Sequence, residues 1–171
     1  PGGWFIEEEA AGGGAVLDHT VHMVDIMRWY IGQEVSEVSA IVDSYYHDIA
    51  IDDAGLLTLE FANGVIASHD PSWSRFAQYP TWGDATIEVI GTKQIVKVDA
   101  FKEHFRMFVS GEKSLEHVFY GNDMDFGLVQ DFVQCVKEGR EPSVTGYDGL
   151  KSLEVALAAY ESSKLKQPIK L

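Results

Sequence analysis

Apolar residues recur at helical spacing in three segments of the chain and alternate with polar residues over much of the remainder. After a glycine run at residues 12–14, apolar side chains return every three or four positions up to Ile31-Gly32, which predicts a helix that ends at a glycine. The same spacing predicts helices over residues 123–138 and 146–164. One helix is therefore expected near the start of the chain and two near its end.

The alternating pattern between these helices predicts strands. The clearest pair, residues 55–61 and 65–69, is joined by Asn63-Gly64, a dipeptide that accepts the positive φ angles of a tight hairpin turn. Further strands are predicted at residues 37–45, 86–90, 94–99, 104–109 and 116–120. The fold class is therefore predicted to be α+β, an open, mostly antiparallel sheet with helices packed on one face.

The composition limits the partners that the chain can have. Its 27 Asp and Glu residues outnumber its 13 Lys and Arg residues and give a formal net charge of -14. Such a surface repels phosphate backbones and anionic lipid headgroups. No apolar run approaches the length needed to cross a bilayer. We therefore expect no nucleic-acid partner and no membrane partner.

The chain has 171 residues, 46% of them hydrophobic, which is enough for one well-packed domain spanning residues 1–171. Its lone cysteine, Cys135, excludes an internal disulfide and is expected to be a small buried hydrophobe. These features favour a reducing, cytoplasmic environment. The first residue is proline rather than methionine, so we expect the chain to be part of a longer protein.

An open sheet with helices on one face leaves its other face uncovered. Apolar residues such as Leu56, Ile66 and Val89 occupy both alternating sets of strand positions. We therefore expect a second copy of the chain to cover that face, which predicts a homo-oligomer. Trp4, Trp29 and the phenylalanines are expected in the core rather than on a ligand platform.

The first predicted helix carries the clearest candidate chemistry. Asp18, His22, Asp25 and Trp29 recur at steps of four, three and four, which places them on one face. A carboxylate one turn before an imidazole lies about 5 to 6 Å from it between Cβ atoms, close enough to orient the ring. Asp18 and His22 could therefore act as a general acid/base pair. An ordinary exposed pair, worth a few tenths of a kcal/mol, has the same spacing.

A metal site built on this helix is not expected. A catalytic zinc needs three converging ligands, whereas His19 is expected to point about 100° away from Asp18 around the helix. Cys135 is not expected to act as a nucleophile, because it lies within an amphipathic helix. No role is assigned to the histidines at positions 47, 69, 104 and 117.

The whole pattern resembles the C-terminal domain of the Gfo/Idh/MocA oxidoreductases, which include glucose-fructose oxidoreductase and inositol dehydrogenase. The resemblance lies in the glycine run followed by Asp18-x-x-x-His22-x-x-Asp25, in the strand series, and in the ending from Thr145 to Pro168. It covers nearly the whole chain in the right order. It implies a domain that forms the substrate side of a cleft, facing a Rossmann domain that holds NAD or NADP.

The resemblance also implies roles for particular residues. His22 would take the hydroxyl proton of a sugar or cyclitol as hydride leaves the substrate carbon, and Asp18 would orient His22 and help to relay the proton. Histidine suits this role because its charge changes near neutral pH. Supporting or substrate-binding positions are implied at Asp25, Trp73, Ser74 and Trp82.

The chain departs from the family pattern in ways that limit what it can do alone. The family often has glycine where this chain has Thr20, its catalytic lysine in a Glu-Lys-Pro motif has no counterpart, and Leu17 replaces the third glycine of a dinucleotide fingerprint. We therefore expect a domain that binds no cofactor by itself and is inactive as an isolated chain. The family's domain also usually begins with a strand before residues 4–14, so we expect this one to lack its first strand. A stand-alone binding or oligomerisation module on the same scaffold is the alternative.

Overall fold

The chain forms two compact units. Residues 1–74 and 141–171 make up the first unit, and residues 75–140 make up the second. The computed structural model describes residues 2–79, 83–101, 104–108, 115–119 and 123–171, with backbone alone in the two short ranges. The predicted single domain over residues 1–171 stays a prediction.

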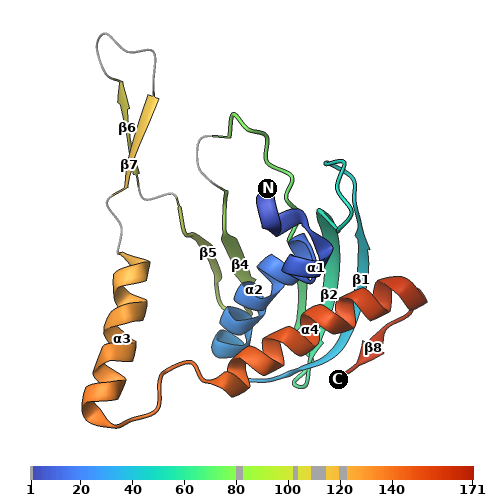
Figure 1. The fold of residues 1–171 in the computed structure, drawn as a ribbon. Helices are drawn as coiled ribbons and strands as arrows, with labels where there is room; N and C mark the ends of the chain where they lie inside the picture. The colour runs from blue at the N-terminus through green and yellow to red at the C-terminus, as the bar shows by residue number, and fades with distance from the viewer. Residues whose placement is uncertain (1, 80–82, 102–103, 109–114, 120–122) are drawn as a thin grey trace. The chain divides into compact units, whose positions relative to one another are not determined.

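The first unit contains a four-stranded sheet in the order β3-β2-β1-β8 (Figure 1). The strands β1 (Val35–Asp43), β2 (Ala54–Phe61), β3 (Ile66–His69) and β8 (Ile169–Lys170) pair antiparallel throughout. Gly64 makes the turn between β2 and β3 with φ of 82°, so the predicted hairpin is confirmed.

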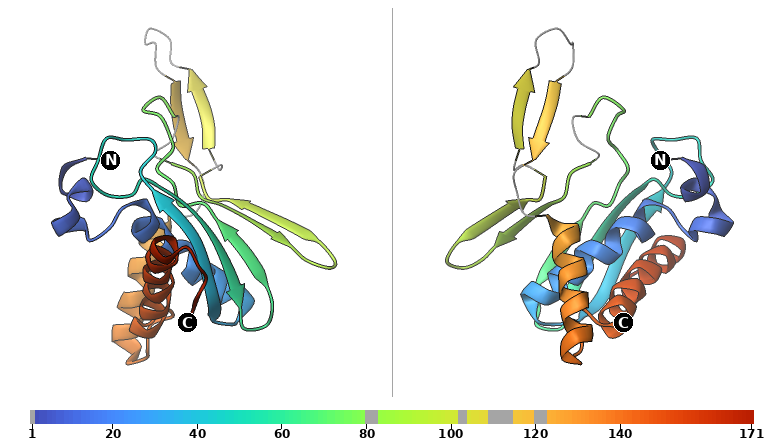
Figure 2. Two further views of the ribbon diagram at one scale, coloured as in Figure 1. Left: turned by 90° about the vertical axis from the view of Figure 1, so that its right-hand side faces the viewer. Right: turned by 60° about the vertical axis from the view of Figure 1, so that its left-hand side comes forward.

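Two helices cover one face of this sheet, α2 (Ala15–Ile31) and α4 (Gly146–Leu165) (Figures 1 and 2). Alternate residues of β2 are buried beneath them, whereas Leu56 and Ile66 on the opposite face are more than half exposed. The prediction of an α+β fold with an open antiparallel sheet and helices on one face is confirmed. The shared core consists of Val16, Val24, Val35, Val38, Leu57, Leu59, Phe61, Val155, Ala158 and Ala159.

The ends of the first unit carry short elements that the sequence pattern did not predict. The 3₁₀ helix η1 (Gly3–Ile6) and the one-turn helix α1 (Glu8–Ala11) precede α2, and the two-residue strand β8 follows α4. Elements of two to four residues span only about one period of an apolar repeat, so hydrophobic spacing cannot reveal them.

The second unit contains two hairpins and a helix. Strand β4 (Thr86–Ile90) pairs with β5 (Ile95–Asp99), and β6 (His104–Phe108) pairs with β7 (Leu115–Phe119). These strands were predicted, but they form two separate sheets within the described ranges rather than extending the first one. Helix α3 (Met124–Glu138) begins where the Asp123 side chain accepts the Phe126 N–H.

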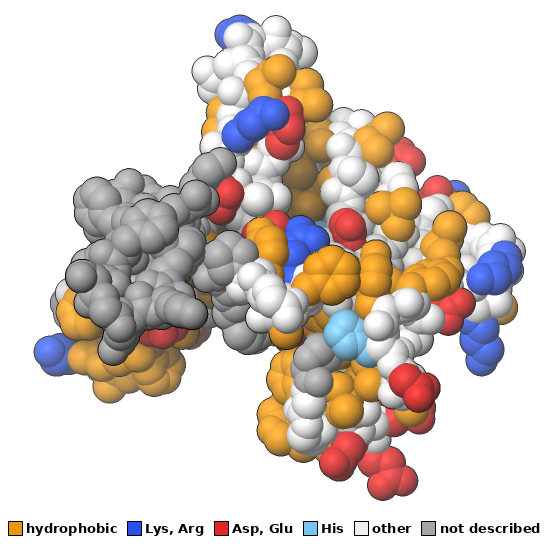
Figure 3. Space-filling view, turned by 90° about the horizontal axis from the view of Figure 1, so that it is seen from above, with side chains coloured by type: hydrophobic (Ala, Val, Ile, Leu, Met, Phe, Trp, Pro, Cys, Tyr) orange, Lys and Arg blue, Asp and Glu red, His pale blue; other side chains and the backbone are white. Residues whose placement is uncertain are grey.

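Some apolar side chains lie where the sequence did not predict them. Trp4 is 61% exposed and Trp29 is 77% exposed, so their predicted burial is wrong. The phenylalanines are divided, with Phe61 in the core and Phe76 on the surface. Cys135 is buried, as predicted. Figure 3 shows hydrophobic side chains reaching the surface on the face that it draws, but the predicted homo-oligomer stays a prediction.

Candidate functional site

The glycine run positions the start of α2 against a loop and against α4. The Asp52 carboxylate accepts the Gly14 N–H at 2.9 Å and the Val16 N–H at 2.8 Å, and the Asp52 carbonyl accepts the Ala15 N–H at 3.0 Å. The Tyr160 hydroxyl donates to the same carboxylate at 2.7 Å. These contacts satisfy N–H groups that a helix start leaves unpaired, so this helix end is closed by protein groups.

The neighbouring aspartates Asp52 and Asp53 both accept hydrogen bonds that hold this part of the structure together. Burial, followed by the Asp52 carboxylate, raises the pKa of Tyr160, so its hydroxyl stays protonated and can donate. Asp53 is fully buried and accepts backbone N–H groups from Tyr45 at 2.7 Å and Tyr46 at 2.9 Å, and a third from His47. Neither aspartate was singled out by the sequence pattern.

Asp18 lies on the first turn of α2 and faces the loop that follows β3. Its Oδ2 accepts the Trp73 indole N–H at 3.3 Å and lies 3.2 Å from His19 Nε2. The expectation that His19 points away from Asp18 is therefore wrong. The other ring nitrogen of His19, Nδ1, lies 2.7 Å from the Pro71 carbonyl oxygen, and this contact turns the ring along the helix toward Asp18.

An aromatic cluster adjoins the Asp18 carboxylate. The Trp73 ring lies 6.0 Å from Phe5 between centroids, and His19 meets it edge-on at 6.5 Å. Phe5 in turn packs edge-on against Trp4 at 4.9 Å. Apolar and aromatic walls with a few well-placed polar groups are typical of small-molecule sites. The exposed Trp4 is thus part of a candidate binding surface.

His22 lies one turn after Asp18 on α2 and is exposed. None of the hydrogen bonds or ion pairs found in the described part of the chain joins it to Asp18, so the expected contact between these two side chains is not formed here. Ser74 follows Trp73 and is half-buried. Trp82, the remaining implied substrate residue, lies outside the described residues.

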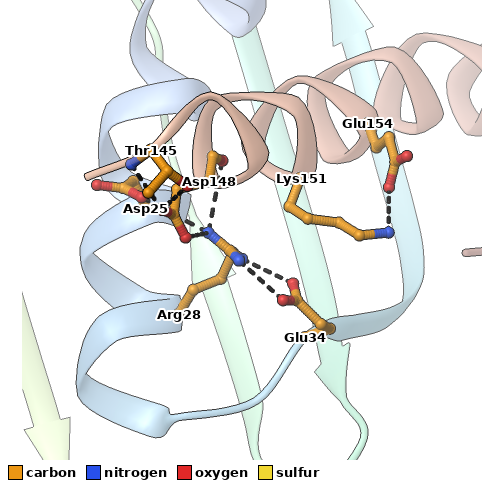
Figure 4. Close-up of polar contacts among 7 residues, drawn as sticks. All are labelled: Asp25, Arg28, Glu34, Thr145, Asp148, Lys151 and Glu154. Carbon is orange, nitrogen blue, oxygen red and sulfur yellow. Dashed lines mark hydrogen bonds and ion pairs between the residues drawn. The ribbon is translucent and has the colours of Figure 1, made fainter. Parts of the chain in front are cut away.

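Asp25 belongs to a second polar cluster, around Arg28 (Figure 4). The Asp25 carboxylate lies 3.6 Å from Arg28 Nη1. Arg28 is nearly buried and donates to both oxygens of Glu34, at 2.7 and 2.8 Å, and to Asp148 at 3.3 Å. These residues line a hollow of about 720 Å³, together with Trp29 and others. The charged groups of this cluster pair with one another. Because Arg28 is on α2, Asp148 on α4 and Glu34 in the loop before β1, these pairs hold the three segments together.

Hydrogen bonds within this cluster shift three pKa values. The bond to Glu34 raises the pKa of Arg28, and the same bond lowers the pKa of Glu34. The pKa of Asp148 is lowered first by the backbone N–H of Thr145, then by the Thr145 hydroxyl, and to a lesser extent by Arg28. Thr145 and Asp148 form a capping box at the start of α4.

Replacing Arg28 with alanine should lower the free energy of unfolding by about 2 kcal/mol at pH 7, since it removes a buried, charge-assisted set of hydrogen bonds. Because folding lowers both carboxyl pKa values, this contribution is present above their ordinary values of 4.5 and 3.8 and is lost as the pH falls through the lowered ones. Urea unfolding at pH 7 and at pH 3 measures it. The difference between variant and wild type should shrink at the lower pH.

Lys151→Ala provides the control for this prediction. Lys151 pairs with Glu154 at 2.7 Å on a half-buried part of α4 (Figure 4), and a single pair three residues apart on a helix contributes little. Its loss of stability should be much smaller than that of Arg28→Ala. Equal losses for the two variants, or a difference that does not change with pH, would contradict the assignment of Arg28 as the stabilising centre.

Within the described ranges, no group of three or more His, Cys, Asp or Glu side chains could hold a metal ion. No helix in these ranges is both long and apolar enough to span a membrane.

These features define an α+β domain with a partly exposed aspartate, a neighbouring histidine and an aromatic wall at the start of one helix. Residues 1–97 match the family model described as the GFO/IDH/MocA C-terminal domain, and the chain belongs to this family. The resemblance found in the sequence is thereby confirmed.

Curated relatives and solved structures extend this match over nearly the whole chain. Myo-inositol 2-dehydrogenase of Thermotoga maritima is 29% identical over 93% of the chain and 49% of the relative. scyllo-inositol 2-dehydrogenase (NAD(+)) of Bacillus subtilis is 28% identical over 93% of the chain and 48% of the relative. The structure of GenD2 from gentamicin A biosynthesis, in complex with NAD, superposes with a TM-score of 0.81 and 25% identity, covering 100% of this chain and 52% of GenD2. The chain thus spans about half the length of the curated relatives it matches.

Proposed function

We propose that this chain is the substrate-binding and catalytic domain of an NAD(P)-dependent oxidoreductase that transfers a hydride between a sugar or cyclitol hydroxyl carbon and nicotinamide. Its family and the names of its inositol dehydrogenase relatives support this assignment. Its coverage of about half of those relatives supports a second, N-terminal domain in the whole protein, which we propose to be a Rossmann domain.

The observation that carries the proposal is the surroundings of Asp18. Its carboxylate accepts the Trp73 N–H beside an aromatic wall, and His22 is exposed one turn further along α2. In this proposal His22 takes the proton of the substrate hydroxyl, and Asp18 orients His22 and helps to pass the proton on. Trp73 and Ser74 contact the substrate, with Trp82 as a further candidate, and Asp25 has a supporting role.

The start of α2 does not fit the pyrophosphate of a dinucleotide. The Gly14 and Val16 N–H groups, which could bind a phosphate, are held by the Asp52 carboxylate. A Cβ at Gly14 would lie 1.7 Å from the Asp52 carbonyl oxygen, so this glycine serves a close backbone contact. We therefore assign NAD or NADP, which would accept the hydride, to the proposed Rossmann domain.

A turnover assay tests the proposed function directly. The 171-residue chain and the longer protein, in which the proposed nucleotide-binding domain precedes it, are each mixed with NAD⁺ or NADP⁺ and a panel of cyclitols and aldoses. We expect reduced cofactor, followed by absorbance, from the longer protein with at least one substrate and none from the chain alone. Turnover by the isolated chain would contradict its expected inactivity. A folded, cofactor-binding longer protein that oxidises no member of the panel would contradict the proposed function.

A further inference from the structure

The side chain of Trp73 has a single polar group, and that group binds the candidate site. An indole N–H can donate a hydrogen bond but cannot accept one. It donates to Oδ2 of Asp18 at 3.3 Å. His19 Nε2 approaches the same oxygen at 3.2 Å, but only the indole N–H is a donor in every state of its side chain. The N–H is therefore engaged before a substrate binds, and Trp73 can offer a substrate only its ring.

The loop that carries Trp73 is fixed to the start of β2. The Trp73 backbone N–H donates to the Asp53 carbonyl oxygen at 2.8 Å. Asp53 is itself fully buried, and its carboxylate accepts the backbone N–H groups of residues 45–47. One residue before Trp73, the Ser72 hydroxyl oxygen accepts the Gly55 N–H at 3.2 Å. The backbone position of Trp73 is therefore set by contacts that involve no ligand.

Ring contacts set the orientation of the half-buried indole. The Trp73 ring lies 6.0 Å from Phe5 between centroids, with an angle of 37° between the ring planes, and 6.5 Å from His19 at 83°. These two neighbours belong to η1 and α2. A side chain packed between other rings has little freedom to change its rotamer. The indole N–H is therefore held against the first turn of α2, where Asp18 lies.

We propose that Trp73 positions the Asp18 carboxyl group of this site through its indole N–H. This inference rests on the proposed function for its catalytic meaning. The Asp18 side chain is 23% exposed, and without this bond it would exchange more freely between rotamers. Within the described ranges no hydrogen bond to its Oδ1 is found, so this second oxygen is available to His22 or to a substrate hydroxyl. Trp73 thus acts on the reaction through Asp18, while its ring remains part of the aromatic wall.

Proton–nitrogen NMR of the indole N–H groups in the 171-residue chain at pH 7 tests this hydrogen bond. The signal that disappears in Trp73→Phe identifies Trp73 among the four tryptophans. Asp18→Leu removes the acceptor, whereas Asp18→Asn keeps a carbonyl oxygen in its place. We expect the Trp73 N–H to exchange with solvent about fivefold faster in Asp18→Leu, the factor that corresponds to a hydrogen bond of about 1 kcal/mol. In Asp18→Asn the rate should stay close to that of the wild type. Equal rates in the wild type and Asp18→Leu, or in the two variants, would overturn the proposal.

Steady-state kinetics of the longer protein test the positioning role. Trp73→Phe keeps an aromatic ring but has no N–H. We expect it to lower kcat by about tenfold to a hundredfold and to leave KM within about threefold, because the lost bond orients a group that acts in the transition state. In an Asp18→Leu background the same change should have almost no further effect on kcat. A raised KM with unchanged kcat, or an equal loss of kcat in both backgrounds, would contradict the positioning role. An inactive wild type would count against the proposed function, while the NMR result would still decide whether Trp73 binds Asp18.

Discussion

Replacing His22 with alanine should lower the kcat of the longer protein by about a hundredfold to ten-thousandfold, the range typical of losing a general base. His22 is exposed beside Asp18 on α2, and no contact found in the described ranges occupies its ring. In the proposed function it accepts the proton of a substrate that docks against Trp73. Because the loss concerns a proton moved in the transition state, kcat should fall more than KM rises. Steady-state kinetics with the best substrate of the panel measure both constants.

Tyr30→Ala is the matched control for this variant. Tyr30 lies on the same helix, is 62% exposed and has a larger side chain, so its loss tests any general effect of trimming the exposed face of α2. Both variants should unfold within about 0.5 kcal/mol of the wild type, as is usual for surface substitutions. If kcat of His22→Ala stayed within threefold of that of Tyr30→Ala, the base would have to be another group, and the assignment to His22 would fail.

The sequence predicts the elements of this fold well where they are long and poorly where they are short. The glycines that end α2 and α3, Gly32 and Gly139, have φ of 69° and 65°, and both ends were predicted from this residue type. Strand β8 could not be predicted, since its two residues form a strand only through pairing with β1. The separation of the β4–β5 and β6–β7 hairpins from the first sheet also escaped prediction, because alternation identifies a strand but not its neighbour.

The sequence likewise predicts the residues of the candidate site that are close together along the chain, but not the contacts between distant ones. Asp18 and His22 could be identified because four residues along a helix place two side chains on one face. The contacts of Asp18 with Trp73 and of Gly14 with Asp52 join residues 55 and 38 positions apart, and no local pattern encodes them. The orientation of the His19 ring toward Asp18 likewise depends on the Pro71 carbonyl, which comes from the loop after β3.

Replacing Gly14 with alanine should lower the free energy of unfolding by about 3 to 5 kcal/mol, a large share of the stability of an ordinary domain. The added Cβ would lie 1.7 Å from the Asp52 carbonyl oxygen and 2.8 Å from its Oδ1. The carbonyl oxygen belongs to the backbone, as does the Asp52 carbonyl carbon at 2.7 Å, so α2 and the Asp52 loop must move apart. That movement breaks the bonds from the Gly14, Ala15 and Val16 N–H groups to Asp52 and leaves a helix end unsatisfied. Urea unfolding followed by circular dichroism measures the loss.

Gly149→Ala separates this steric effect from the general effect of adding a methyl group. Gly149 lies within α4, and nothing is within 4 Å of its added Cβ, so alanine should raise the free energy of unfolding by about 0.5 to 1 kcal/mol through helix propensity. The two glycine variants should therefore change stability in opposite directions. A Gly14→Ala protein as stable as the wild type would mean that α2 does not dock on Asp52. The cap that closes its N-terminus would then be absent, and the N–H groups of this helix end would be free to bind a dinucleotide phosphate.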